Sequence, residues 1–202
     1  MNKILLICIL TISLHGIAQE FHGGPVLGIV ASQVDGDHFE GYNKTGPVIG
    51  GFVTYPLKEK WDILLEIHYI QKGSLNKANP DIPEKMYYKL RLNYFEVPII
   101  AKYQYREKIY FTGGLNVGFL FKAFEEGIDK TGALVKSEEE SFHKMDYCLS
   151  TGIQYQIVDK LYSSASLNYS VFMIRGQNGN GLIDMRTGQY NNFLIFCLYY
   201  RL

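Results

Sequence analysis

After residue 18 the sequence has no continuous apolar run of about 18 to 20 residues, the length that a membrane-spanning helix requires. It also has no surplus of charge, with 20 basic and 20 acidic residues, and this balance gives no indication of nucleic-acid binding. No Pro-rich or Ser-rich linker divides the chain. These absences predict one domain, either exported and soluble or a membrane barrel built of strands.

Cysteine is scarce, with Cys8, Cys148 and Cys197 as the three in the chain. Ile7 is large where a lipoprotein cleavage site has a small residue, so we expect no lipid anchor at Cys8. Cys148 and Cys197 fall in the sixth and eighth candidate strands, which are not neighbours, whereas a disulfide needs Cα atoms within about 7 Å. We expect both to be free thiols, and we expect no metal site.

The first residues have the order of an export signal. Asn2-Lys3 is the positive region, Ile4 to Leu14 is the apolar region, and Gly16-Ile17-Ala18 has the small-x-small pattern of a cleavage site. We predict cleavage after Ala18, which divides the chain into a signal peptide at 1–18 and one domain at 19–202. Loss of Lys3 leaves 19 basic residues against 20 acidic ones.

The rest of the chain alternates between eight strand-like stretches and two kinds of connection. Tight charged turns fall at 58–60, 106–108 and 158–160, and longer polar segments fall near 33–44, 73–87, 123–142 and 173–190. An up-and-down barrel of a bacterial outer membrane has this asymmetry, with short turns on the periplasmic side and longer loops outside.

Alternation along the candidate strands separates apolar from polar faces. Trp61, Ile63, Leu65, Ile67 and Tyr69 share one face, opposite residues such as Glu66 and His68, and the stretches at 109–122, 145–156, 161–171 and 193–202 divide similarly. A soluble barrel would turn the apolar face inward, and a lipid-embedded barrel would turn it outward. Alternation alone leaves both arrangements open.

Aromatic residues at the strand ends favour the membrane. Trp61 and Tyr69 are separated by roughly 26 Å along an extended strand, close to the thickness of an apolar band. Tyr55, Tyr103, Tyr105 and Tyr155 lie beside the tight turns, where half-wet aromatic side chains mark a membrane interface. We predict an all-β fold, an eight-stranded antiparallel up-and-down transmembrane barrel.

The fourth strand changes phase. Leu90, Leu92 and Tyr94 share one parity, whereas Val97 and Ile99 share the other. A β-bulge near 95–96 would supply the extra residue, and a bulge also tolerates a nearby proline such as the one at 98. The first two strands, near 21–32 and 45–57, are rich in glycine, which predicts tight curvature or close packing against interior side chains.

Several sequence pieces together resemble the PorT-like outer-membrane β-barrel family. They are Asp35-Gly36-Asp37, the segment from Glu66 to Gly73, the segment from Leu92 to Pro98, and Thr112-Gly113-Gly114. The resemblance implies an eight-stranded barrel in the outer membrane of a Gram-negative bacterium. The founding member of the family is associated with a protein secretion system, and most members have no assigned activity.

An eight-stranded barrel has an interior just wide enough for side chains to fill it, which excludes a general diffusion pore. We predict a polar network in the lumen formed by Glu66, His68, Arg91, Glu96 and Lys102. Structural ion pairing is the first interpretation of this network. A file that conducts protons or ions is the alternative, since charged residues inside a membrane are frequently functional.

Other polar motifs are interpreted as loop features. Ser141 and His143 could share a strand face as a nucleophile and base, but no carboxylate is fixed beside them, and we predict that the protein is not an enzyme. Asp35, Asp37 and Glu40 lack the spacing of a calcium loop. The acidic residues at 125, 126, 129 and 138–140 predict an acidic surface facing outward.

The sequence therefore predicts an integral outer-membrane barrel with a structural, scaffold or partner-binding role, possible attachment to secretion, and no cofactor. Its expected partners are outer-membrane lipid and an envelope or secretion-system protein. The alternative is a soluble, exported, lipocalin-like barrel that binds an apolar ligand. That alternative requires the apolar faces of the third, fifth and eighth strands to point inward.

Overall fold

The computed structural model describes residues 21–37, 39, 41–77, 87–128, 134–138, 141–176 and 188–202, with the backbone alone for 134–138. The predicted signal peptide at 1–18 lies outside the described residues. Among the residues that are described, no helix has the length and apolarity needed to cross a membrane. The strands are β1 (His22–Asp35), β2 (Lys44–Lys58), β3 (Trp61–Asn76), β4 (Tyr88–Arg106), β5 (Ile109–Ile128), β6 (Leu134–Glu138), β7 (Met145–Val158), β8 (Leu161–Ser170) and β9 (Tyr190–Tyr200).

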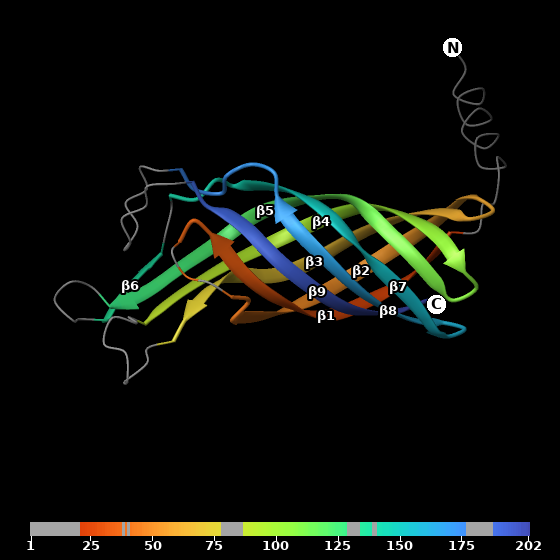
Figure 1. The fold of residues 1–202 in the computed structure, drawn as a ribbon, viewed down its shortest axis with the longest axis horizontal. Helices are drawn as coiled ribbons and strands as arrows, with labels where there is room; N and C mark the ends of the chain where they lie inside the picture. The colour runs from red at the N-terminus through yellow and green to blue at the C-terminus, as the bar shows by residue number, and fades with distance from the viewer. Residues whose placement is uncertain are drawn as a thin grey trace, which may run out of the picture.

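The strands close into a barrel (Figure 1). Their order in the sheet is β4-β3-β2-β1-β9-β8-β7-β5, all neighbours are antiparallel, and a further pairing of β4 with β5 joins the two ends. Within the described part of the chain, β6 pairs only with β5, at Phe124–Ile128, and extends β5 beyond the closed ring. The predicted eight-stranded antiparallel up-and-down barrel is thereby confirmed.

The tight turns are confirmed as two-residue connections at 59–60, 107–108 and 159–160. They gather at the end of the barrel where the C-terminus lies, and β6 lies at the opposite end (Figure 1). We name these the turn end and the loop end, and the turn end is periplasmic by the asymmetry of outer-membrane barrels. Strands extend further toward the loop end than expected, since β3 reaches Asn76 and β5 reaches Ile128.

The apolar faces of the strands point outward. Phe111, Leu167 and Phe196 are each close to half exposed, and Leu115 and Leu198 are exposed by 56% and 50%. A continuous apolar surface of this kind is not tolerated in water but matches the acyl chains of a bilayer. The predicted orientation is confirmed, and the lipocalin-like alternative, which required these faces to point inward, is wrong.

Aromatic rings border the apolar band at both ends, as the sequence predicts. Such rings suit the interface because they combine an apolar body with a polar edge. Ring pairs at the turn end are Phe21–Tyr55, Trp61–Tyr103 and Tyr105–Phe111, and ring pairs toward the loop end are Phe95–Phe121, Tyr147–Phe172 and Tyr169–Tyr190.

The predicted bulge near 95–96 of β4 is wrong. Even-numbered residues of β4 face inward along its whole length, and its register with β3 is unbroken across that point. Leu90 and Leu92 are apolar because they fill a dry part of the interior, whereas Ile99 is apolar because it faces lipid. The irregularity lies on the neighbouring strand, where β5 gains one residue at Phe121 between the pairs Tyr94↔Leu120 and Asn93↔Lys122.

Glycines of β1 and β2 permit close packing, as expected. A Cβ atom on Gly50 would lie 2.5 Å from the Cβ of His68, and one on Gly28 would overlap the Sγ of Cys197. The interior side chains of β3 and β9 therefore lie directly against the backbone of the neighbouring strands.

Candidate functional site in the barrel interior

Strands β3 and β4 bring charged side chains into the barrel. The inward face of β3 carries Glu66, His68 and Lys72, and the inward face of β4 carries Glu96 and Lys102. All five residues are at most 6% exposed. Side chains of a strand alternate between its two faces, so residues separated by an even number of positions point to the same side. The charged residues of β3 therefore share one wall of the lumen, and those of β4 share the neighbouring wall.

Five of the buried charged residues form one connected group, the central charge network, consisting of Glu66, His68, Lys72, Glu96 and Asp146. The Lys72 ammonium contacts the Glu96 carboxylate and lies 3.0 Å from Asp146 Oδ2. The His68 ring lies between two carboxylates, with Nδ1 3.2 Å from Glu66 Oε2 and Nε2 3.3 Å from Glu96 Oε2. Each charge thus has a partner of opposite sign, which a buried ion requires.

Hydrogen bonds attach the central charge network to the opposite wall. Asp146 accepts the Ser170 hydroxyl at 2.7 Å and the Asn191 amide at 2.8 Å, and Glu66 accepts the Tyr199 hydroxyl at 2.9 Å. These contacts join β3 and β4 to β7, β8 and β9 across the lumen. The network therefore acts as a cross-brace between distant strands.

An apolar layer surrounds Lys72 and extends from there toward the loop end. The Lys72 ammonium lies 4.6 Å from the centre of the Tyr94 ring and 4.0 Å from that of Phe193, so two aromatic rings cover the cation. The layer continues with side chains that are at most 2% exposed: Val30, Val34, Val48, Ile70, Leu90, Leu92 and Leu120. The layer is mostly apolar and includes the buried hydroxyl groups of Ser32 and Ser74.

A second ionic cluster closes the loop end. Arg175 follows β8 and forms an isolated bridge with Gln189. Its guanidinium donates two hydrogen bonds to Glu125, at 3.2 and 3.3 Å, and a third at 2.8 Å to the Gln189 side chain. The Tyr88 hydroxyl also donates to Glu125, at 2.5 Å, and the guanidinium lies 4.3 Å from the Phe142 ring. This outer arginine cluster is nearly fully buried.

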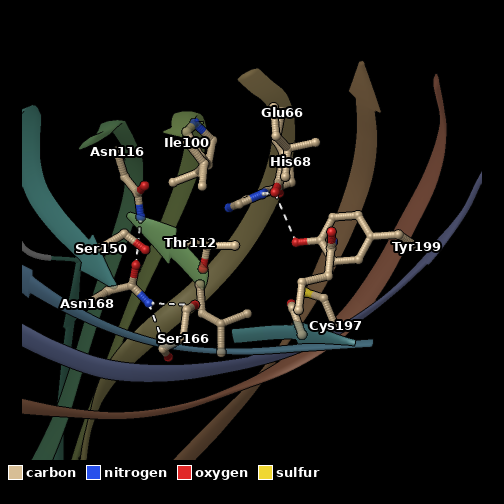
Figure 2. A pocket seen from close by; sticks show the side chains of 15 residues that line it. Glu66, His68, Ile100, Thr112, Asn116, Ser150, Ser166, Asn168, Cys197 and Tyr199 are labelled. Atoms are coloured by element: carbon tan, nitrogen blue, oxygen red, sulfur yellow. Dashed lines mark hydrogen bonds and ion pairs between the residues drawn. The ribbon is translucent and has the colours of Figure 1, made fainter. Parts of the chain in front are cut away.

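The turn-side half of the interior is polar and contains space. A small cavity of about 40 Å³ is lined by Glu66, His68 and polar residues of β5, β7 and β8, among which Asn116 donates to Asn168 at 2.9 Å (Figure 2). A larger cavity of about 240 Å³ lies closer to the turns, beside Lys102. The two cavities share Leu64, Gln154 and Tyr199 in their linings, so the space in this half extends from the region of Lys102 toward Glu66 and His68.

In the described part of the chain, the interior is polar and contains cavities toward the turn end, and it is filled by buried side chains toward the loop end. In the central charge network, His68 and Lys72 each lie between two carboxylates, a pattern that braces strands. In the described part of the chain no group of three or more His, Cys, Asp or Glu side chains could hold a metal ion.

Comparison with known proteins identifies the fold family. Residues 15–174 match the family model of the outer membrane protein beta-barrel domain. The chain belongs to this family. No curated protein matches the sequence.

Solved structures agree with this assignment. Ail, the attachment invasion locus protein of Yersinia pestis, is similar with a TM-score of 0.53 at 14% identity, and with 0.52 at 12% in complex with the heparin analogue sucrose octasulfate. Each comparison covers 91% of this chain and 99% of Ail. Neisserial surface protein A follows with a TM-score of 0.49 at 10% identity, covering 90% and 96% of the two chains. At these identities the likeness to Ail shows a shared fold.

The structure brings together only part of the polar network predicted for this beta-barrel domain. Glu66, His68 and Glu96 lie in one network. Lys102 faces the lumen but lies nearer the turn end, with its ammonium 3.8 Å from Asp62. Arg91 does not belong to the network, because its odd position places it on the outer face of β4, where it pairs with Glu126 at 3.1 Å.

Sequence reasoning missed four central residues. Lys72 lies on the same even-numbered face of β3 as Glu66 and His68, two inward positions beyond His68. A longer predicted third strand would have included it. Asp146 was placed on the polar face of its strand but not paired. Glu125 was predicted in an outward acidic loop, and this is wrong, because the extra residue at Phe121 turns it inward. Arg175 had no signal, since it comes from a connection between strands.

The remaining candidate motifs have local roles. His143 Nδ1 donates to the Met173 carbonyl at 2.9 Å, and Asp37 accepts the amide of Phe39 at 2.9 Å. Glu40, the third residue of the possible calcium loop, lies outside the described residues. Cys148 and Cys197 are buried free thiols. The absence of enzymatic activity stays a prediction.

Proposed function

We propose that this protein is a non-conducting outer-membrane barrel that serves as a membrane-anchored scaffold for an envelope partner protein, in connection with protein secretion. The observation that carries the proposal is the sealed interior. The apolar layer and the outer arginine cluster lie across the lumen, and each charged residue of the central charge network contacts at least one of opposite sign. A barrel whose lumen does not conduct is expected to act by binding other molecules at its surface.

The loop end supplies a surface suited to a partner. Beyond the point where β2 leaves β3, at the pair Val48↔Ile70, strands β3, β4, β5 and β6 continue as a sheet that projects from the ring (Figure 1). Among the described residues no strand pairs with the second edge of β6. An edge without a described partner strand can accept a strand of another protein through backbone hydrogen bonds.

The link to secretion rests on the resemblance to the PorT-like family. The segments Glu66–Gly73 and Leu92–Pro98 carry that resemblance, and in the barrel they pair with each other across β3 and β4. They supply Glu66, His68, Lys72 and Glu96 of the central charge network. The resemblance thus concerns the part of the chain that braces the barrel.

Two measurements test the proposal. Planar bilayers containing the refolded mature protein should show no current steps, and reproducible single-channel steps would contradict a sealed barrel. In the native envelope, replacement of residues 134–138 by a Gly-Ser segment should abolish both secretion and a photo-crosslink placed at Lys136. The matched control is a crosslinker at Leu115, which faces lipid and should give no protein adduct. Normal secretion by the Gly-Ser variant would refute the scaffold role.

A further inference from the structure

On the outer wall of the barrel, apolar side chains give way to charged ones just beyond the aromatic rings that border the apolar band toward the loop end. On β3, β4 and β5 the side chains of Tyr69, Phe95 and Phe121 form one ring cluster, with the Phe95 and Phe121 rings 4.8 Å apart. Such rings mark the level of the membrane interface. The next outward positions toward the loop end lie at the height of the lipid headgroups.

These positions carry cations. Lys122 directly follows Phe121 on the outer surface because of the extra residue in β5, and it faces Asn93 of β4. Arg91 and Lys89 occupy the next two outward positions of β4. We name Lys89, Arg91 and Lys122 the outer cationic patch. Amphipathic cations at this depth extend their apolar stems over the wall and present their charge at the headgroups.

Neighbouring groups hold the outer cationic patch in place. The Lys122 ammonium lies 4.4 Å and the Arg91 guanidinium 5.0 Å from the centre of the Phe124 ring. Glu126 accepts one Arg91 nitrogen, Nη2, at 3.1 Å. The Arg91 Nε is buried and makes no hydrogen bond within the described structure. The Arg91 guanidinium therefore donates one hydrogen bond through Nη2, whereas its Nε–H has no acceptor within the described structure.

Amide groups extend the patch along the wall. Gln71 donates to Asn93 Oδ1 at 3.0 Å, and the Asn93 amide donates to the Lys122 carbonyl at 3.1 Å. On the far side Lys44 donates to Gln71 Oε1 at 3.0 Å. This row of polar groups follows the barrel wall from β2 to β5, parallel to the aromatic border beneath it.

We propose that the outer cationic patch binds the phosphate groups of a glycolipid headgroup in the outer leaflet of the membrane. A guanidinium matches the oxygens of a phosphate, and flanking ammonium groups supply the remaining charge. The acyl chains of the same lipid would pack on the aromatic and aliphatic wall directly below. This inference rests on the orientation of the barrel in the membrane and does not depend on the proposed protein partner.

Native mass spectrometry of the folded mature barrel tests the inference, with bis-phosphorylated lipid A as the probe. Wild type should retain this lipid in preference to its dephosphorylated form. A variant carrying Lys89→Gln, Arg91→Gln and Lys122→Gln should retain it at least about tenfold more weakly, since several cations close to an anionic surface act together. The matched control, Lys58→Gln, Lys60→Gln and Lys108→Gln, removes the same charge at the turn end and should bind as wild type does.

Three results would overturn the proposal. They are unchanged binding by the triple variant at the patch, equal binding of the dephosphorylated lipid, and full competition by phosphatidylglycerol, which would show general attraction to anions. Heat-modifiable gel mobility confirms that each variant is folded. Should the triple variant not fold, Arg91→Gln alone is measured, and binding equal to that of wild type would again overturn the proposal.

Discussion

Replacement of Lys72 by methionine tests whether the central charge network braces the barrel. Lys72 is fully buried, and its ammonium contacts both Glu96 and Asp146. Methionine has a similar length and suits the rings of Tyr94 and Phe193, so packing is largely kept. Two carboxylates would remain in the interior without their cation, and breaking a buried ion pair in this way costs about 3–5 kcal/mol.

The lower part of that range applies here. Asp146 retains the hydrogen bonds from Ser170 and Asn191, and Glu96 retains its contact with His68. We therefore expect Lys72→Met to lower the free energy of unfolding by about 3 kcal/mol at neutral pH. The assay is reversible urea unfolding in lipid vesicles, followed by the mobility of folded and unfolded protein on unheated gels.

The chain offers a matched control in Lys102. Its ammonium lies 3.8 Å from Asp62, whose side chain is 28% exposed. Lys102 is buried, but Asp62 is partly exposed and can be hydrated once the ammonium is removed, so Lys102→Met should lower the free energy of unfolding by about 1 kcal/mol or less. Adding Glu96→Gln to Lys72→Met should restore part of the loss, because it removes one uncompensated charge. Equal losses for the Lys72 and Lys102 variants would refute the bracing role.

Three further predictions use the same unfolding assay. Leu115→Arg places a charge on the lipid face and should lower stability by about 2–4 kcal/mol, and a loss below 1 kcal/mol would argue against lipid contact. Gly50→Ala should cost about 1–3 kcal/mol by overpacking against His68, whereas Gly51→Ala, whose added Cβ meets its nearest atom at 3.5 Å, should be close to neutral. Arg175→Ala leaves the buried Glu125 carboxylate without its cation and should lower the free energy of unfolding by about 3 kcal/mol, and a loss below about 1 kcal/mol would contradict the stabilising role of the outer arginine cluster.

Most of the fold could be predicted from the sequence because a lipid-embedded barrel imposes two simple patterns. Strands such as Trp61–Tyr69 alternate strictly, since one face meets lipid and the other meets the lumen. Short charged turns such as 107–108 recur at one end only. Both patterns are local in the sequence, so they can be read without knowing which strands pair.

The phase of β4 could not be predicted correctly because its apolar residues have two different origins. Leu90 and Leu92 fill the dry layer inside the barrel, and Ile99 faces lipid on the outside. Hydrophobicity alone does not distinguish an apolar interior from an apolar solvent. The sequence pattern therefore imitates a bulge on β4, while the real irregularity lies at Phe121 on its partner strand.

The interior network was only partly predictable for a related reason. Glu66, His68 and Glu96 follow from alternation within single strands. Arg91 was misplaced because its assignment depended on the wrong phase of β4. The partnership of Lys72 with Asp146 joins residues far apart in the chain, and neither the distance nor the facing direction of β7 across the lumen is encoded in local periodicity.

The pairing of the first barrel strand with the last has a consequence for biogenesis. Strand β9 supplies the partner for β1 from Val26 to Asp35 and also for β8. Until β9 has been exported, two rows of backbone amides and carbonyls, on β1 and β8, lack partners, a condition that hydrocarbon does not tolerate. Stable insertion therefore requires β9, so a chain that lacks this strand cannot close its barrel in the bilayer.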